Sequence, residues 1–359
     1  MMPRRSQVSG LILAALLAGS TVAQAGQPQL TVTQLTTTAG CNDGGNFYPS
    51  LSANARRIVF SSSCDLVPGG NPDQNDEVYV MNVKGLNLTQ LTSATGGLGS
   101  YHASLNPQGT RVAFASDRDL VPGGNADGNT EIFTIRVNGS GLTQLTHTTG
   151  GSPFFTGNHY PRFDPLGQQI VFTSDRDLVA GGNADGNHEV FVMNLDGTGV
   201  VQLTHSLAGF GNSDGSLDLT GQKLLFTSDR DLVPGENTDQ NAEVFTMNVD
   251  GSDLRQLTHT DNPAAFGNVA PRWTPDAQTL AFRSDIDLTG DNPDASLEAY
   301  RMKIDGTGLI QITSSSSGFS APWDISADGK TIAVHSNRSL VPGSNTDLNF
   351  EIYLVELQP

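Results

Sequence analysis

Positive charge and cysteine are the scarce components of this 359-residue chain. It holds 19 Lys+Arg residues against 37 Asp+Glu, a formal net charge of −18, and only two cysteines. Phosphate backbones and anionic membranes repel a surface this acidic, which disfavours nucleic acid and membrane lipid as partners. Two cysteines cannot make a disulfide framework or a four-cysteine zinc site, and at most they form one bridge.

Charged residues as a class are also few. They make up 16% of the chain, which is too low for an acidic disordered protein. The 40 glycines and 18 prolines occur without the triplet period of collagen. The composition therefore favours a folded, turn-rich protein.

The first 25 residues have the pattern of a secretory signal peptide. Arg4 and Arg5 precede an almost wholly apolar stretch over 8–23, and Ala23-Gln24-Ala25 fits a small-x-small cleavage site. We expect cleavage near Gly26 and export to the periplasm or the exterior. No later run approaches the length of a transmembrane helix, so we expect no membrane span in the mature chain.

The remaining residues, 26–359, repeat one pattern about every 55 residues. Each copy has a β-rich segment, an enlarged loop, a strand opened by Glu, and a tight turn such as Asn138-Gly139. A Gln-Leu-Thr or Gln-Ile-Thr strand then ends at Thr36, Thr92, Thr146, Thr204, Thr258 and Thr313. With one further strand before each unit, the copies predict six four-stranded blades at 47–92, 101–146, 160–204, 213–258, 270–313 and 321–357.

The two ends of the chain complement each other. The chain finishes on a third strand, 351–355, while an orphan fourth strand, 30–36, stands first. We expect strand 30–36 to complete the last blade. This closure leaves no long strand edge exposed, and we expect a monomer.

The repeats resemble the TolB-like, WD-repeat-like β-propeller family. The resemblance rests on segments such as Pro271-Arg-Trp-Thr-Pro-Asp276, Leu280-Ala-Phe-Arg-Ser284 and Glu243-Val-Phe-Thr-Met-Asn248, each followed by Gln-Leu-Thr or its variant. It covers nearly the whole mature chain and implies an all-β, six-bladed propeller. We expect this chain to lack the α/β domain that precedes the propeller in TolB itself.

The enlarged loop of every blade carries the pattern Asn-x-Asp-x-(Asn/Ser)-x-Glu. Alternating oxygen ligands are what Ca²⁺ requires, and two copies serve as candidate ligand sets: Asn125, Asp127, Asn129, Glu131 and Asn183, Asp185, Asn187, Glu189. The alternative is structural, with Asn and Asp holding the loop backbone and Glu capping strand amides. Because every blade must fold whereas a ligand site usually occurs once, the six-fold recurrence favours the structural role.

Sites in a repeat protein are better sought where the repeat breaks. Irregular residues on the loop-rich rim include His159, Phe155, Phe210 and Phe266. On the innermost strands, charged residues replace the serines of other blades and could bind a charged group in a central funnel: Arg162, Arg272 and Asp324. The alternatives are that the aromatic residues fill gaps between blades and that the charges form an ion pair closing the channel.

Cys41 and Cys64 are both predicted on the rim of the first blade. Cys41 lies in the loop before that blade, and Cys64 occupies a position held by arginine in four other blades. In an oxidising compartment we expect a disulfide between them.

The sequence has no Gly-x-Ser-x-Gly motif at a strand-to-helix elbow, as in serine hydrolases, and no His-Glu-x-x-His motif, as in zinc proteases. Its paired aspartates recur from blade to blade, so no one pair stands out as a candidate general acid. We therefore predict an exported, non-catalytic binding or scaffold module. Its acidic, loop-rich face would bind a protein, peptide or glycan. The alternatives are an exported enzyme or enzyme accessory acting on a peptide or glycan in a rim pocket, and a calcium-stabilised structural propeller.

Overall fold

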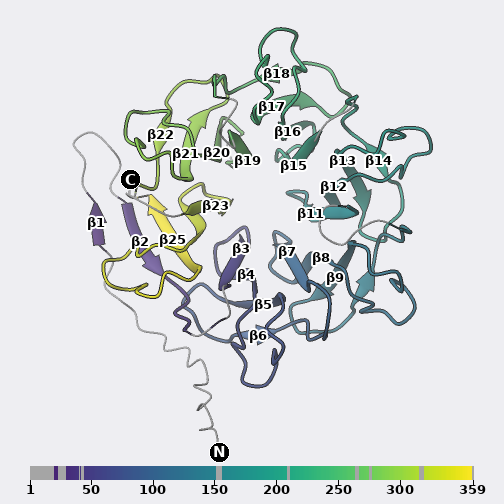
Figure 1. The fold of residues 1–359 in the computed structure, drawn as a ribbon, viewed down its shortest axis with the longest axis vertical. Coiled ribbons are helices and arrows are strands. Elements are labelled where there is room, and N and C mark those ends of the chain that lie inside the picture. The colour runs from purple at the N-terminus through teal and green to yellow at the C-terminus, as the bar shows by residue number, and fades with distance from the viewer. Residues whose placement is uncertain are drawn as a thin grey trace, which may run out of the picture.

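The computed structural model describes residues 20–22, 30–39, 41, 44–150, 156–207, 211–262, 267–274, 277–314 and 319–357. These residues form antiparallel sheets arranged as six blades around a central axis, with no helix among them (Figure 1). The predicted six-bladed, all-β propeller is therefore confirmed. Apart from residues 20–22, the predicted signal peptide lies outside the described residues.

The first strand of each blade lies innermost and the fourth outermost. Blade 1 consists of β3 (Asn46–Leu51), β4 (Arg57–Ser62), β5 (Glu77–Asn82) and β6 (Thr89–Gln90). Blade 2 consists of β7 (Ser100–Leu105), β8 (Arg111–Ser116), β9 (Glu131–Arg136) and β10 (Thr143–Gln144). Blade 3 consists of β11 (Asn158–Phe163), β12 (Gln169–Ser174), β13 (Glu189–Asn194) and β14 (Val201–Gln202). Blades 4 and 5 consist of β15 (Asn212–Leu217), β16 (Lys223–Ser228), β17 (Glu243–Asn248) and β18 (Arg255–Gln256); β19 (Asn268–Trp273), β20 (Thr279–Ser284), β21 (Glu298–Lys303) and β22 (Ile310–Gln311).

The sixth blade joins the two ends of the chain. It contains β23 (Ser320–Ile325), β24 (Thr331–Ser336) and β25 (Glu351–Leu357), and its fourth strand is β2 (Leu30–Gln34). β2 pairs antiparallel with β25 from Leu30↔Leu357 to Gln34↔Tyr353, which confirms the predicted closure by the N-terminal strand. β1 (Ser20–Val22) adds a fifth strand beside β2.

Aromatic pairs fill the core of each of the first five blades. In blade 2, Phe114 on the second strand lies opposite Phe133 on the third, and their rings stack with centroids 5.7 Å apart. Both side chains are fully buried. The same stacked pair recurs in the other blades as Phe60–Tyr79, Phe172–Phe191, Phe226–Phe245 and Phe282–Tyr300.

The outermost strand is shorter than the sequence pattern predicts, because threonine side chains replace part of its backbone pairing. Strand β10 ends at Gln144, yet Leu145 N still donates to Ile132 O at 2.8 Å. At the next step the hydroxyl of Thr146 accepts the Ile132 N–H at 2.8 Å. The equivalent threonine does the same in all six blades, which explains why the Gln-Leu-Thr segment recurs.

A buried glutamate links neighbouring blades. Glu131 accepts hydrogen bonds from the backbone N–H and hydroxyl of Thr148, at 2.5 and 2.6 Å, and from the side-chain amide of Asn158 at 2.9 Å. Asn158 begins the innermost strand of the next blade, so the carboxylate ties blade 2 to blade 3. Equivalent links join Glu189 to Asn212, Glu243 to Asn268, and Glu351 to Asn46.

Close backbone contact reinforces these links. The N–H of Ser100, at the start of blade 2, donates to Asp76 O of blade 1 at 2.7 Å. Gly99 precedes it with φ +123°, and a Cβ there would lie 2.1 Å from the same carbonyl oxygen. Only glycine allows the two blades to approach this closely.

The structure confirms the predicted disulfide between Cys41 and Cys64, whose Cα atoms are 5.1 Å apart. It ties the segment that follows the closure strand to blade 1. Within the described part of the chain, no helix is long and apolar enough to cross a membrane.

We predict that Glu131→Ala lowers the free energy of unfolding by about 3 kcal/mol, because the buried amide of Asn158 and two half-buried donors of Thr148 lose their acceptor. The exposed Glu236, which lies in a loop of blade 4, provides a matched control. Glu236→Ala is expected to change stability by less than about 0.5 kcal/mol. Urea unfolding of both variants measures the difference, and equal stabilities would contradict the linking role of Glu131.

Candidate functional site

The innermost strands surround the central axis, and the pairing of each with its neighbour is irregular. The register of β3 against β4 shifts between Phe47 and Ser50, and the same shift occurs in every blade. In five blades the third residue of this strand has a left-handed φ between 52° and 58°: Tyr48, His102, Tyr160, Asp214 and Ala270. Such a conformation is costly for residues other than glycine, and strained backbone of this kind gathers at functional sites.

Side chains of the preceding blade hold several of these irregular residues. The N–H of Asp214 donates to the hydroxyl of Thr173 at 3.2 Å, and that of Ala270 donates to the hydroxyl of Thr227 at 3.1 Å. In blade 1 the N–H of Tyr48 donates to Nδ1 of His335 at 2.9 Å. A histidine nitrogen that accepts a hydrogen bond is unprotonated, so this contact fixes His335 as the neutral ring with its proton on Nε2.

Blade 6 departs from this scheme. Its third residue is Pro322, which has no N–H to satisfy, and the preceding blade supplies Arg283 at the position where blades 3 and 4 supply threonine. The Arg283 guanidinium instead lies over the ring of Trp323, 4.6 Å from its centroid. This is a cation–π contact.

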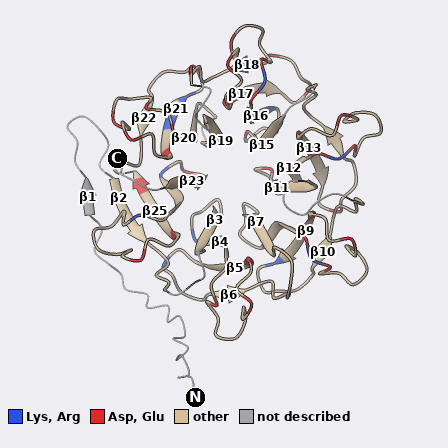
Figure 2. Cartoon of the chain, viewed as in Figure 1, with Lys and Arg blue, Asp and Glu red and all other residues tan. Residues whose placement is uncertain are grey.

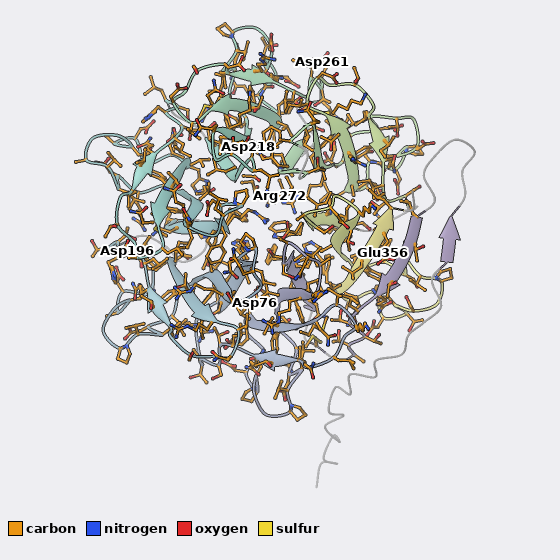
Figure 3. The ribbon with its side chains drawn as sticks, turned by 180° about the vertical axis from the view of Figure 1, so that it is seen from behind. Asp76, Asp196, Asp218, Asp261, Arg272 and Glu356 are labelled. Atoms are coloured by element: carbon orange, nitrogen blue, oxygen red, sulfur yellow. A yellow bond between two sulfur atoms is a disulfide. The ribbon has the colours of Figure 1, made fainter. Side chains whose placement is uncertain are left out.

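Trp323 divides the channel into two parts. Its buried ring contacts Tyr48 on one side, with centroids 4.7 Å apart, and lies within 5.9 Å of the guanidinium carbons of Arg162 and Arg272 on the other. Two cavities open on either side of it and share no lining residue. In Figure 3, Arg272 lies at the centre of the ring, whereas Asp196 and Asp261 lie at its outer edge.

The first cavity, here called the loop-side pocket, opens on the face that carries the enlarged loops. Its volume is about 310 Å³, and its lining consists of Tyr48, Asp76, Leu98, Tyr101, His102, His159, Tyr160 and His188. The His102 ring contacts that of Tyr160 at 4.0 Å between centroids. The sequence placed His159 on this rim, and the structure places it in the wall of this pocket.

Burial controls the charges in the loop-side pocket. It lowers the pKa of His159 to about 4 and that of His102 well below its usual value, so both rings are neutral at pH 7. Burial raises the pKa of Asp76 to about 6. Within the described residues, His102 Nδ1 and His159 Nε2 are buried without a hydrogen-bond partner.

The second cavity, here called the turn-side pocket, opens at the opposite end of the channel. The structure brings the three predicted funnel residues together in its wall: Arg162, Arg272 and Asp324. Burial lowers the pKa of both arginines. Of the two arginines, Arg272 forms an ion pair, 3.7 Å from Asp214, a residue that the sequence did not suggest as its partner.

The candidate calcium ligands take part in hydrogen bonds that shape each loop. The side-chain amide of Asn125 donates to Asn129 O at 2.8 Å, Asn129 donates to Thr148 O at 2.9 Å, and Asp127 accepts from Gly150 N at 2.7 Å. Glu131 is the link between blades. The second set repeats this scheme: Asn183 donates to Asn187 O, Asn187 to Ser206 O, and Glu189 accepts from Ser206 and Asn212.

These contacts fit the structural role of the loop. The exception is the side-chain oxygens of Asn125, Asn129, Asn183 and Asn187, which find no donor among the described residues. In the same residues no group of three or more His, Cys, Asp or Glu side chains could hold a metal ion.

The aromatic rim residues Phe155, Phe210 and Phe266 lie outside the described residues. Four residues at the channel were not predicted from the sequence: Trp323, Tyr48, Tyr160 and Arg283. Tyr48, His102 and Tyr160 follow the first residue of their strands by two positions, and an alignment of the six repeats at that position would have revealed them.

Comparison with known proteins supports the fold. No family model matches the chain. An uncharacterized protein of Agrobacterium fabrum is 25% identical over 234 residues, which cover 62% of this chain and 71% of that protein.

Three solved structures share the architecture. TolB from Acinetobacter baumannii gives a TM-score of 0.54 at 18% identity over 77% of this chain, which spans only 56% of the TolB chain. A candidate TolB from Agrobacterium tumefaciens gives 0.56 at 15% identity, with 95% and 100% of the two chains covered. An oligogalacturonate lyase in complex with manganese gives 0.52 at 12% identity, with 98% of both chains covered. The predicted resemblance to TolB-like propellers is thus confirmed at the level of the fold.

We predict that EDTA leaves the melting temperature unchanged, because backbone and side-chain donors already occupy the loop carboxylates that a calcium ion would need. Differential scanning calorimetry with and without the chelator measures this. A lower melting temperature with EDTA, restored by added Ca²⁺, would contradict the structural role of the loops.

A second prediction concerns His335, whose pKa burial lowers to about 3. This pKa lies below that of a histidine in the unfolded chain, so the folded state disfavours protonation of His335. The contribution of His335 to protein stability is therefore greatest above about pH 6.5 and is lost as the pH falls. His335→Thr introduces the residue that the repeat has at Thr173 and Thr227, and removes this titration. Between about pH 7.5 and 4.5, the difference in unfolding free energy between the two proteins should change by about 2.5 kcal/mol in favour of the variant.

Denaturant titrations at the two pH values provide the measurement. His147→Thr is the control, because His147 is exposed. A pH dependence of His335→Thr identical to that of the wild type would show that His335 is not held neutral.

Proposed function

We propose that this protein is an exported, non-catalytic binding module that holds a protein, peptide or glycan in the loop-side pocket, at the centre of its acidic face. Export rests on the signal-peptide pattern of residues 1–25. The site is the pocket defined above, and the acidic loops form its surroundings.

The observation that carries the proposal is the uneven distribution of side chains around the channel. Three positions are equivalent in every blade: the residue before the linking glutamate, and the second and third residues of the innermost strand. In blades 1 to 3 these places hold mainly aromatic and ionisable residues, whereas blades 5 and 6 have mainly aliphatic ones there, such as Val269, Ala270, Leu297 and Ala321. A purely structural ring would not require this difference.

The chemistry of the pocket suits a ligand with a flat apolar part and polar groups. Tyr48, Tyr101 and Tyr160 provide aromatic walls, which bind sugar rings and side chains by apolar contact. His102, His159 and Asp76 line the same pocket and provide its polar groups. Pockets with apolar walls and a few convergent polar groups are the usual form of a binding site.

The acidic face is less acidic than its sequence suggests. The six motif glutamates are buried, and five of them bond to a residue of the neighbouring blade, so they are not available to a partner. The aspartates of the same loops are mostly exposed, among them Asp127, Asp185 and Asp347, and acidic residues lie in the loops around the ring (Figure 2). This surrounding charge favours a neutral or basic ligand over an anionic one.

An enzyme acting on a peptide or glycan is the second candidate. The shared fold with an oligogalacturonate lyase is compatible with it, but a fold hosts many activities. Binding without turnover separates the two candidates experimentally.

We predict that Asp76→Asn reduces capture of the ligand at least about tenfold, because it removes a carboxylate held in the pocket. The immobilised mature protein is exposed to periplasmic extract and culture medium, and captured molecules are identified by mass spectrometry. Asp76→Asn is not expected to lower the melting temperature at about pH 7.5, because the fold raises the pKa of this carboxyl and so disfavours its charge.

Asp127→Asn is the matched control, since this exposed aspartate lies on the same face outside the pocket. It should leave capture unchanged. Equal capture by wild type and Asp76→Asn would contradict the proposed site. Chemical conversion of the captured molecule on incubation would favour the enzyme.

A further inference from the structure

The turn-side pocket lies beyond Trp323 and is independent of the site proposed above. Its volume is about 150 Å³, which corresponds to roughly five water molecules at about 30 Å³ each. Its apolar lining comes from the last residues of the innermost strands and from the turns that follow them. Its polar lining consists of Arg162, Arg272, Asp324, Asp164, Ser104, Ser216 and Thr274.

The two guanidinium groups of this pocket are buried but poorly partnered. Arg162 is 9% exposed, and its one hydrogen bond in the described part of the chain runs from Nη2 to Trp323 O at 3.2 Å. Arginine carries five N–H donors, and Arg162 Nε is buried without any partner. Arg272 is 4% exposed and donates to Trp323 O, Pro271 O and Asp214 O, yet its Nη2 also lacks a hydrogen-bond partner.

The nearby carboxylates are engaged by other donors. Asp324 accepts from Ser50 Oγ at 2.6 Å, from Leu51 N at 2.9 Å and from Ile325 N at 2.9 Å. Asp164 accepts the backbone amides of Gln168 and Gln169 through Oδ1. Among the described residues, no ion pair within 4.0 Å joins Arg162 to a carboxylate.

A buried guanidinium whose N–H donors lack acceptors is costly to a fold, since the hydrogen bonds it gave up to water are not replaced. A ligand that supplies the missing acceptor would remove that cost. The guanidinium plane matches the two oxygens of a carboxylate, and the hydroxyls of Ser104 and Ser216 line the same cavity.

The carboxylates around the pocket determine how much negative charge a ligand can carry. Asp324 and Asp164 also line the pocket, and Asp214 lies beside Arg272, so a dianion such as phosphate or sulfate would meet repulsion that a single negative charge largely avoids. The cavity volume further restricts the ligand to a few non-hydrogen atoms. We propose that the turn-side pocket binds a small monocarboxylate through Arg162 and Arg272.

Acetate is the probe for this proposal. The full-length mature protein is melted in sodium acetate, sodium sulfate and sodium chloride at equal ionic strength, and line broadening of the acetate methyl signal is followed by NMR. We expect acetate, relative to chloride, to raise the melting temperature saturably by about 2 °C. The acetate signal should broaden with the wild-type protein, and sulfate should give no saturable shift.

Two arginine variants supply the controls. Arg162→Met should abolish both the shift and the broadening while keeping the fold, since it removes the desolvation cost of a buried cation that has no ion-pair partner within 4.0 Å among the described residues. Arg283→Met should keep both responses, because Arg283 also contacts Trp323 but does not line the pocket.

Equal melting temperatures in acetate and chloride would overturn the proposal, as would an undiminished acetate response in Arg162→Met. A sulfate effect matching that of acetate would indicate a general anion site and would also overturn it. If Arg162→Met does not fold, the anion series on the wild-type protein still decides.

Discussion

A carboxylate buried between neighbouring blades is the interaction on which this propeller depends. The glutamate that opens the third strand accepts hydrogen bonds from the loop that leaves its own blade and, in four of the six blades, from the asparagine that begins the next, as with Glu131, Thr148 and Asn158. Each blade alone is a small sheet with an exposed face, and the links allow neighbouring faces to bury each other. In blade 5, Arg338 pairs with Glu298 at 3.0 Å instead, so the same position accepts a different partner.

Because these links hold the blades together, the side chains of the innermost strands are free to differ between blades. In blades 1 to 3 the third residue of the innermost strand lines one pocket, and in blades 3 and 5 the fifth residue, Arg162 or Arg272, lines the other. The repeated backbone leaves the side chains at these positions free to differ. The channel therefore holds tyrosines and histidines on one side of Trp323 and arginines on the other, although the surrounding blades are nearly equivalent. Two chemically different pockets arise in one ring because Trp323 separates them.

Much of the fold could be predicted from the sequence because it depends on local repetition. The period, the closure of the ring by residues 30–36 and the Cys41–Cys64 bridge all follow from pattern and position. The burial of Glu131 and its equivalents was harder to see, since a charged residue in a polar loop resembles a surface residue until its donors are placed. The contact of Arg283 with Trp323 joins two blades whose spacing in the sequence carries no signal, and only the three-dimensional ring reveals it.

The central claim is that the channel, and not the outer loops, is where this protein binds its ligand. A crystal structure of the mature protein with the ligand captured from its own compartment tests this most directly. The account predicts ligand density in the loop-side pocket, in contact with Tyr160, His159 and Asp76. Density confined to the outer loops, with only water in the channel, would contradict it.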